Sequence, residues 1–259
     1  MTNPAGTPIW YELNTADPDA AKKFYDHVIG WTVEAEPMSP EMDYRGIGTA
    51  DGAMVGGVMR LTNDMVSNGA RPTWLFYIAV DDVDASVATV KANGGAVHLP
   101  PWDIPDVGRI SMVSDPQGIP FYVMRGVSDQ SSTAWDRMGM GKCNWNELLT
   151  PDQQAGNRFY ADTFGWSYPD KMAMGEMGDY VFIDAGGQTI GATMKVQAHD
   201  QPGWRFYFRT PDIEATAAKV TEAGGKVIAG PMDVPGGDRI IVASDPEGVV
   251  FGAVAPGNS

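Results

Sequence analysis

The chain has 259 residues, a formal net charge of −15 and a single cysteine, Cys143. This length accommodates one large domain or two domains of ordinary size. An acidic surface repels phosphate backbones and anionic lipid, so neither nucleic acid nor a membrane is expected as a partner. One cysteine excludes an internal disulfide and a four-cysteine zinc site. The first residues carry no secretion-signal pattern, so we expect a cytoplasmic protein.

The first half of the chain contains two similar modules, each with a strand, then a helix, then short strands. Residues 9–15 are expected to form a strand. Asp17 and Pro18 are typical of the start of a helix, and Gly30 is typical of its end. The other expected elements are strands near 31–35, 44–50 and 53–60, a strand at 74–80, a helix at 82–93, and strands near 96–99, 109–114 and 119–124.

The second half of the chain repeats the first. Residues 8–34 are identical to residues 143–169 at 10 of 27 positions, and residues 74–125 are identical to residues 204–255 at 20 of 52. Repeats of this kind indicate duplicated domains. We therefore predict two domains, 1–127 and 134–259, joined by a polar linker at 128–133.

Two motifs recur at matching places in both halves. The first strand and helix read Trp-x-Glu-Leu-x-Thr followed by Asp-x-x-x-Ala/Gly-x-x-Phe-Tyr, and Ser-Asp-Pro-x-Gly precedes the last strand. In this order, with paired βαβββ modules, the chain resembles the vicinal oxygen chelate superfamily of glyoxalase I, extradiol dioxygenases and bleomycin resistance proteins. It looks most like the tandem-domain, glyoxalase-like subgroup. The resemblance implies an α+β fold of two glyoxalase-like domains, each a curved eight-stranded mixed sheet around a cleft.

The resemblance also implies where a metal would bind. Metalloenzymes of this superfamily hold a divalent ion with His, Glu or Gln side chains from the first and fourth strands of each module. The matching positions are Trp10, a residue near Gly57, Leu75 and Tyr122 in the first half, and Trp145, a residue near Ala192, Arg205 and Gly252 in the second. These are not usual metal ligands. We therefore predict no metal of the usual kind and no other cofactor.

The histidines support this prediction. The chain has only three, His27, His98 and His199, and none recurs at the matching place in the other half. We interpret each as a surface or packing residue.

Strand alternation places Trp10 and Glu12 on one face of the first strand, and Trp145 and Glu147 on the matching face in the second half. If this face lines the cleft, a carboxylate beside a large aromatic ring has the surroundings of a general base, or of a group that holds a cationic or hydroxylated ligand. The alternative is a buried glutamate that pairs with an arginine, with Arg109 and Arg239 as the candidates.

The remaining candidate ligand-binding residues differ between the halves. The first half offers Tyr77 and Tyr122, and the second offers Arg205, Tyr207 and Arg209. Arg109 and Arg239 each follow an aspartate by six residues, at Asp103 and Asp233. Each pair could form a cleft rim that binds a polar group. The alternative is an ion pair that stabilises the loop.

Two function hypotheses follow. In the first, the chain binds a small aromatic or heterocyclic molecule in its clefts without the usual metal. In the second, it is an enzyme, either an isomerase or lyase of glyoxalase type with Glu12 or Glu147 as base, or a dioxygenase-related enzyme with a non-standard metal site. A third interpretation, a purely structural protein, predicts clefts filled by side chains. We expect a monomer or homodimer, and the sequence does not identify the ligand.

Overall fold

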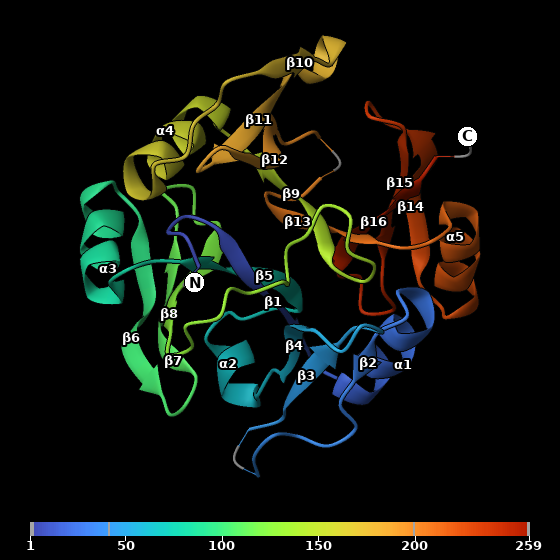
Figure 1. Ribbon diagram of the computed structural model, residues 1–259, viewed down its shortest axis with the longest axis horizontal. Helices are drawn as coiled ribbons and strands as arrows, with labels where there is room; N and C mark the ends of the chain where they lie inside the picture. The colour runs from blue at the N-terminus through green and yellow to red at the C-terminus, as the bar shows by residue number, and fades with distance from the viewer. Residues whose placement is uncertain (1–2, 41, 199, 258–259) are drawn as a thin grey trace. The chain divides into compact units, whose positions relative to one another are not determined.

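The structure is a computed structural model that describes residues 3–40, 42–198 and 200–257. The first half contains β1 (Pro8–Thr15), α1 (Pro18–Val28), β2 (Thr32–Val33), β3 (Tyr44–Gly48), β4 (Met54–Arg60), α2 (Asn63–Ser67), β5 (Thr73–Ala79), α3 (Val83–Ala92), β6 (Ala96–Ile104), β7 (Gly108–Ser114) and β8 (Pro120–Gly126) (Figure 1). The second half contains β9 (Cys143–Thr150), α4 (Gln153–Phe164), β10 (Lys171–Ala173), the 3-10 helix η1 (Gly175–Met177), β11 (Asp179–Ala185), β12 (Gln188–Lys195), β13 (Gly203–Arg209), α5 (Ile213–Glu222), β14 (Lys226–Asp233), β15 (Asp238–Ser244) and β16 (Val250–Pro256).

Each half of the sequence supplies one eight-stranded sheet. The strand orders are β2-β3-β4-β1-β5-β8-β7-β6 and β10-β11-β12-β9-β13-β16-β15-β14. Both sheets are mixed, because β1–β4, β5–β8, β12–β9 and β13–β16 are parallel pairs, whereas the hairpins that flank them are antiparallel. The predicted α+β fold of paired βαβββ modules is therefore confirmed. Helix α2 was not among the predicted elements.

Local sequence explains where the main helices begin. The Asp17 side chain accepts hydrogen bonds from the backbone N–H groups of Asp19 and Ala20, and Pro18 occupies the first turn of α1. Asp82 caps α3 in the same way. Past the end of α1, Gly30 has a φ of +86°, a conformation that glycine adopts readily and other residues rarely do.

Contacts divide the chain into two compact units that do not coincide with the two halves. Unit 1 comprises Met1–Ile9, Leu75–Ser132 and Trp145–Trp204, and unit 2 comprises Trp10–Trp74, Thr133–Asn144 and Arg205–Ser259. Each unit thus combines one module from each half. The domain limits at residues 127 and 134 remain a prediction.

The core of unit 2 contains an aromatic cluster that joins α1 to β16. The ring of Phe24 meets that of Phe251 at 5.9 Å, and α1 also contacts α5, which lies beside it in Figure 1. Beneath them runs a buried hydrogen-bond chain. The indole N–H of Trp74 donates to the Tyr25 hydroxyl at 3.0 Å, and that hydroxyl donates to Asp245 at 3.2 Å. Burial raises the pKa of the Asp245 carboxyl.

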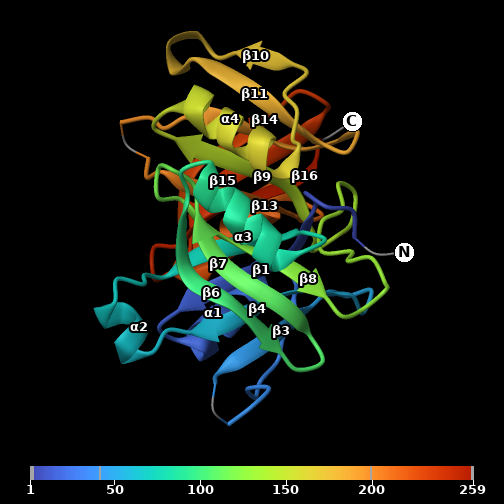
Figure 2. The same ribbon diagram turned by 90° about the vertical axis from the view of Figure 1, so that its left-hand side faces the viewer.

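Unit 1 contains the matching chain in its own core. Trp204 donates to the Tyr160 hydroxyl at 3.1 Å, and this hydroxyl lies 3.5 Å from the carboxylate of Asp115. Burial raises the pKa of Asp115 too. Helix α4, which carries Tyr160, lies beside α3, as Figure 2 shows. Both units therefore contain the same tryptophan–tyrosine–aspartate chain in an aromatic core.

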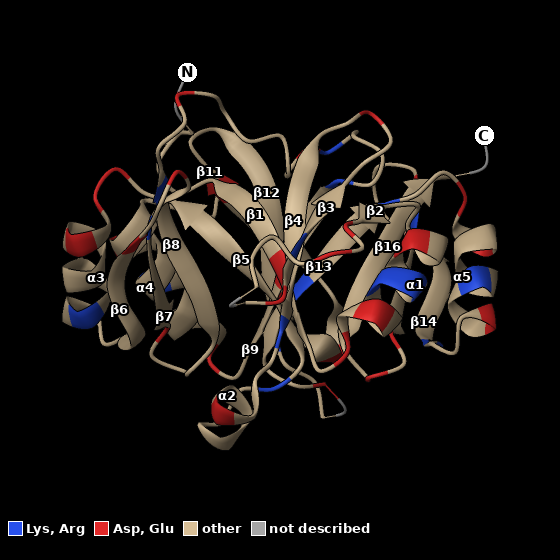
Figure 3. Cartoon of the chain, turned by 90° about the horizontal axis from the view of Figure 1, so that it is seen from below, with Lys and Arg blue, Asp and Glu red and all other residues tan. Residues whose placement is uncertain are grey.

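Charged side chains gather on the helices and loops. Figure 3 shows acidic and basic residues on α1, α3 and α5, whereas the strands carry few of either. Within the described part of the chain, no helix is both long enough and apolar enough to cross a membrane.

Candidate functional site

In unit 2, α1 covers one face of the strands, and the candidate residues lie on the other. Arg45 of β3 forms an ion pair with Asp19 of α1 at 2.6 Å, so Arg45 marks the covered face. Its neighbour Tyr44 points the opposite way. There the Tyr44 hydroxyl accepts a hydrogen bond of 2.7 Å from the indole N–H of Trp10. Glu12, two residues along β1, shares this face and is 1% exposed. We call Trp10, Glu12 and Tyr44 the first triad.

The absence of a side chain at Gly57 leaves space for the Tyr44 ring of the first triad. Gly57 of β4 pairs with Glu12 of β1, so both residues lie in one row of the sheet. A Cβ atom at Gly57 would overlap the ring of Tyr44. The Tyr44 ring therefore lies across the bare backbone of β4, beside the row that carries the buried carboxylate.

Unit 1 repeats this arrangement with Trp145, Glu147 and Tyr180, the second triad. The Trp145 indole N–H donates to the Tyr180 hydroxyl at 2.8 Å, and that hydroxyl donates to Glu147 Oε1 at 2.8 Å. Glu147 is 5% exposed, whereas both rings are half-buried. Helix α4 lies against the other face of this sheet, where Asn157 accepts a hydrogen bond from Thr193. The second triad thus places a buried carboxylate among partly exposed rings.

The residues at the expected metal positions of the triad strands, Trp10, Gly57, Trp145 and Ala192, offer no side-chain ligand atom to a divalent ion. Tryptophan offers only an N–H donor, and the donors of Trp10 and Trp145 are already given to tyrosine hydroxyls. Gly57 and Ala192 have no donor atom, and the Tyr44 ring covers Gly57. Across residues 3–40, 42–198 and 200–257, no three His, Cys, Asp or Glu side chains are grouped closely enough to hold a metal.

The other candidate tyrosines pack differently in the two units. In unit 1, Tyr77 stacks on Tyr122 with ring centroids 4.4 Å apart and planes at 13°. In unit 2, Tyr207 pairs across the sheet with Gly252, and a Cβ at Gly252 would overlap the Tyr207 ring. One ring therefore fills the place that two rings share in unit 1. Arg205, two residues before Tyr207, is half-buried.

Arg109 and Arg239 lie away from these faces. Arg109 forms ion pairs with Asp84 of α3 at 2.7 Å and with Asp103 at 3.0 Å, so it lies on the face that α3 covers. Arg239 likewise pairs with Asp233 at 3.0 Å and with a glutamate of α5. These carboxylates engage both guanidiniums, so the hypothesis that either arginine pairs with Glu12 or Glu147 is wrong. The alternative of ion pairs between Arg109 and Asp103, and between Arg239 and Asp233, matches the structure.

The other charged candidates serve the scaffold. The guanidinium of Arg209 is 2% exposed and contacts Asp238 through two 3.2 Å hydrogen bonds. His27 faces Glu222 of α5 at 3.5 Å on the surface, and His98 is exposed on β6. His199 lies outside the described residues.

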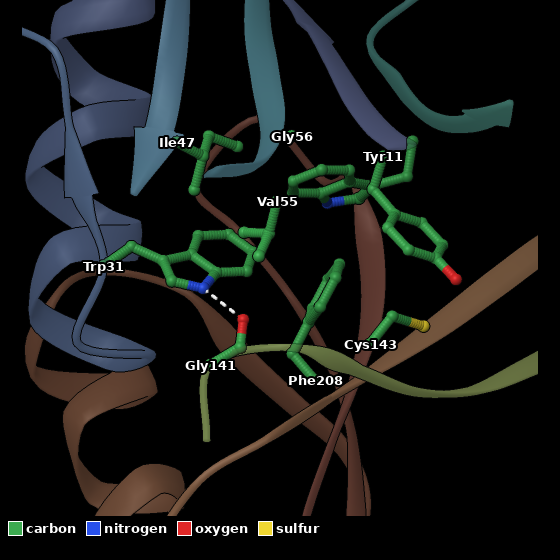
Figure 4. A pocket seen from close by; sticks show the side chains of 9 residues that line it. Tyr11, Trp31, Ile47, Val55, Gly56, Gly141, Cys143 and Phe208 are labelled. Atoms are coloured by element: carbon green, nitrogen blue, oxygen red, sulfur yellow. Dashed lines mark hydrogen bonds between the residues drawn. The ribbon is translucent and has the colours of Figure 1, made fainter. Parts of the chain in front are cut away.

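A cavity in unit 2 lies on the opposite face of β1 from the first triad. It is too narrow to admit a water molecule. Figure 4 shows its lining, formed by Tyr11, Trp31, Ile47, Val55, Gly56, Trp74, Gly141, Cys143 and Phe208. The Trp31 indole donates to the carbonyl of Gly141 at 2.6 Å within it. This cavity is therefore a packed part of the core and not a ligand site.

Tyr44 and Tyr180, which complete the triads, were not among the residues predicted from the sequence. Both follow an aspartate, in Asp43-Tyr44 and Asp179-Tyr180. This repeated pair is the signal that could have identified them. It falls where the offset between the halves changes, so a comparison at fixed spacing does not align the two tyrosines.

Comparison with known proteins supports the resemblance. A family model described as "Glyoxalase/Bleomycin resistance protein/Dioxygenase superfamily" matches residues 8–123 and 142–252. "Putative glyoxylase CFP32" from Mycobacterium tuberculosis is 36% identical over 253 residues, which cover 97% of this chain and 95% of that protein. "Anthracycline biosynthesis protein DnrV" from Streptomyces peucetius is 31% identical over 265 residues, covering 96% of this chain and 93% of that one.

Solved structures share the fold. The Mn(II)-bound glyoxalase from Novosphingobium aromaticivorans matches with a TM-score of 0.68 at 20% identity, covering 97% of this chain and 82% of that one. The 2,3-dioxygenase LapB from Pseudomonas sp. KL28 matches with a TM-score of 0.65 at 14% identity, covering 99% and 94%. At these identities the likeness concerns the fold alone.

Proposed function

Because the chain belongs to the glyoxalase/bleomycin resistance protein/dioxygenase superfamily, we propose that it binds a small aromatic or heterocyclic molecule and does so without the usual divalent ion. The observation that carries this proposal is that tryptophan side chains occupy the positions where metalloenzymes of the superfamily place metal ligands. There the chain places the indole rings of Trp10 and Trp145, each fixed by a hydrogen bond to a tyrosine hydroxyl.

The chemistry of the triads suits an aromatic ligand. The rings are half-buried, so part of their surface is available for stacking or edge contacts with another ring. Because each indole N–H is already bound, a ligand meets the ring itself and not a polar edge. The buried carboxylate nearby favours ligands that bring a hydrogen-bond donor or a positive charge.

The relatives add support of a different kind. One of them is named for anthracycline biosynthesis, and anthracyclines are fused aromatic ring systems with hydroxyl and amino groups. This chain is 31% identical to that protein over 96% of its own length, which supports a ligand of the same chemical class.

A second candidate function is catalysis of glyoxalase type, with Glu147 or Glu12 as general base. The observation in its favour is the hydrogen bond from the Tyr180 hydroxyl to Glu147, which holds a buried carboxylate in one orientation. The name of the mycobacterial relative points the same way. In this version the same triad binds the substrate and removes a proton from it.

Calorimetry and thermal shift with 9-aminoacridine, a flat heterocyclic cation, test the proposal. We expect binding and a raised melting temperature that are the same in EDTA and in excess Mn²⁺. Binding that requires Mn²⁺, or stoichiometric metal in the purified protein by elemental analysis, would overturn the metal-free part. Loss of turnover on a panel of 2-oxoaldehyde adducts in Glu147→Gln, with binding retained, would favour the enzyme.

A further inference from the structure

We infer that the chain carries two ligand sites of unlike shape, one at each triad, and that the residue two strands away from the triad carboxylate, in the same row of the sheet, sets the shape that each site accepts. This inference rests on the proposed function and adds its stoichiometry and a specificity-determining residue, Phe182. The site at the first triad accepts both flat and bulky aromatic cations, and the site at the second accepts only flat ones.

The two triads share their main features. Each places a tryptophan and a glutamate two residues apart on the first strand of its half, and a tyrosine hydroxyl accepts the indole N–H at 2.7 or 2.8 Å. Both carboxylates are at most 5% exposed. Burying a carboxylate costs stability. The tryptophan–tyrosine hydrogen bond and the buried carboxylate are therefore present in both halves, and each copy lies in its own compact unit.

The two rows that contain the carboxylates differ in their other residues. Across the second sheet, Glu147 pairs with Ala192, which pairs with Phe182. Across the first sheet, Glu12 pairs with Gly57, which pairs with Gly46. The row of Glu147 thus carries the benzyl group of Phe182, whereas the row of Glu12 has glycine at the matching position, Gly46.

The Phe182 ring packs against the two rings of the second triad. The Phe182 ring meets Trp145 at 6.1 Å and 82°, and Tyr180 at 5.9 Å and 83°. Three rings in edge-to-face contact form a stiff corner, which suits a thin, flat ligand and leaves little room for a substituent.

In the first sheet the same place is filled by a flexible side chain. A Cβ at Gly46 would overlap the terminal methyl group of Met54, which is 43% exposed, and would lie 3.3 Å from the Glu34 carboxylate. Methionine is unbranched and adapts its shape readily. Met54 can therefore move aside for a bulky group, which Phe182 cannot do without breaking its contacts with two rings.

The experiment is a calorimetric titration of the full chain with two cations of different shape. We expect two 9-aminoacridine molecules per chain, but only one daunorubicin, whose amino sugar projects from the ring system. Tyr44→Phe and Tyr180→Phe are matched variants, since each removes one triad hydroxyl and keeps the ring. The loss of one hydrogen bond predicts about tenfold weaker binding at the altered site. Tyr44→Phe should weaken daunorubicin binding, and Tyr180→Phe should leave it unchanged.

Phe182→Gly tests the specificity residue directly. We expect the variant to bind a second daunorubicin, with Phe182→Leu as the replacement if circular dichroism shows that the glycine variant does not fold. One 9-aminoacridine per chain, or two tyrosine variants that weaken the same binding event, would overturn the inference and leave the proposed function intact. If neither cation binds the wild-type chain, the proposed function fails, and the inference fails with it.

Discussion

Removal of the Tyr25 hydroxyl should destabilise unit 2, and the loss should depend on pH. This hydroxyl accepts from Trp74 at 3.0 Å and donates to Asp245 at 3.2 Å, and all three groups are buried. In Tyr25→Phe, the indole N–H and one carboxylate oxygen lose this partner. Leaving buried polar groups unsatisfied costs about 2 kcal/mol, which corresponds to a fall in melting temperature of roughly 4–8 °C for a chain of this size.

The sign of the pH dependence follows from Asp245. Burial raises the pKa of this carboxyl above its ordinary value of 3.8, so the folded chain keeps a proton there that the unfolded chain has released. That contribution to stability is fully present below pH 3.8 and is lost as the pH rises through the folded pKa. The Tyr25 hydrogen bond lowers the same pKa, so its removal raises the pKa further. The substitution therefore destabilises the ionised carboxylate more than the protonated one. The decrease in the free energy of unfolding should be larger at pH 7 than at pH 4.

Urea unfolding of Tyr25→Phe at pH 7 and pH 4 measures this difference. The matched control is Tyr160→Phe in unit 1, where the hydroxyl lies farther from its carboxylate, at 3.5 Å from Asp115. Its loss should change less with pH. A destabilisation by Tyr25→Phe that is equal at both pH values, or that is smaller than the effect of Tyr160→Phe at pH 7, would refute the reasoning.

Three further substitutions test other parts of the scaffold by urea unfolding. Gly252→Ala should destabilise by about 1–3 kcal/mol, because the new Cβ overlaps the buried Tyr207 ring; an unchanged midpoint would contradict that packing. Glu247→Gln should cost about 1 kcal/mol, since Glu247 accepts from a hydroxyl and a backbone N–H at the end of β1; a gain in stability would contradict this. Arg45→Met should cost about 2 kcal/mol at pH 7 and less near pH 2, because the guanidinium holds the pKa of Asp43 below its ordinary value; a loss that grows with acidity would be the wrong sign.

The repeated motifs, and the family resemblance that they carry, were sufficient to predict the fold. Helix caps such as Asp17 and Asp82 are local signals, because the capping side chain contacts backbone only two or three residues away. Strand alternation also placed Trp10 and Glu12 on one face, since a period of two depends on nothing beyond the strand itself. These features could be predicted because their causes lie within a few residues.

The arginines could not be predicted by the same reasoning. Strand alternation shows which residues of β7 share a face with Arg109, but it does not show which face α3 covers. The partner of Arg109, Asp84, lies 25 residues earlier, on that helix. The sequence also could not predict which modules combine in each compact unit. A repeat shows that modules are alike and therefore gives no preference for the module that each one packs against. Both features depend on tertiary contacts, for which the sequence carries no local signal.

The union of distant modules in unit 2 has a consequence for synthesis of the chain. The contact between Tyr25 and Asp245 joins residues 220 positions apart, so this core cannot close until nearly the whole chain has left the ribosome. At the usual rates of translation, the segment that contains Asp245 is synthesised roughly 10–45 s after α1. During that time Phe24 and Tyr25 lack the Phe251 ring that meets them in the folded chain. The nascent protein therefore presents an aromatic surface to the chaperones of the cell well before it can bury that surface itself.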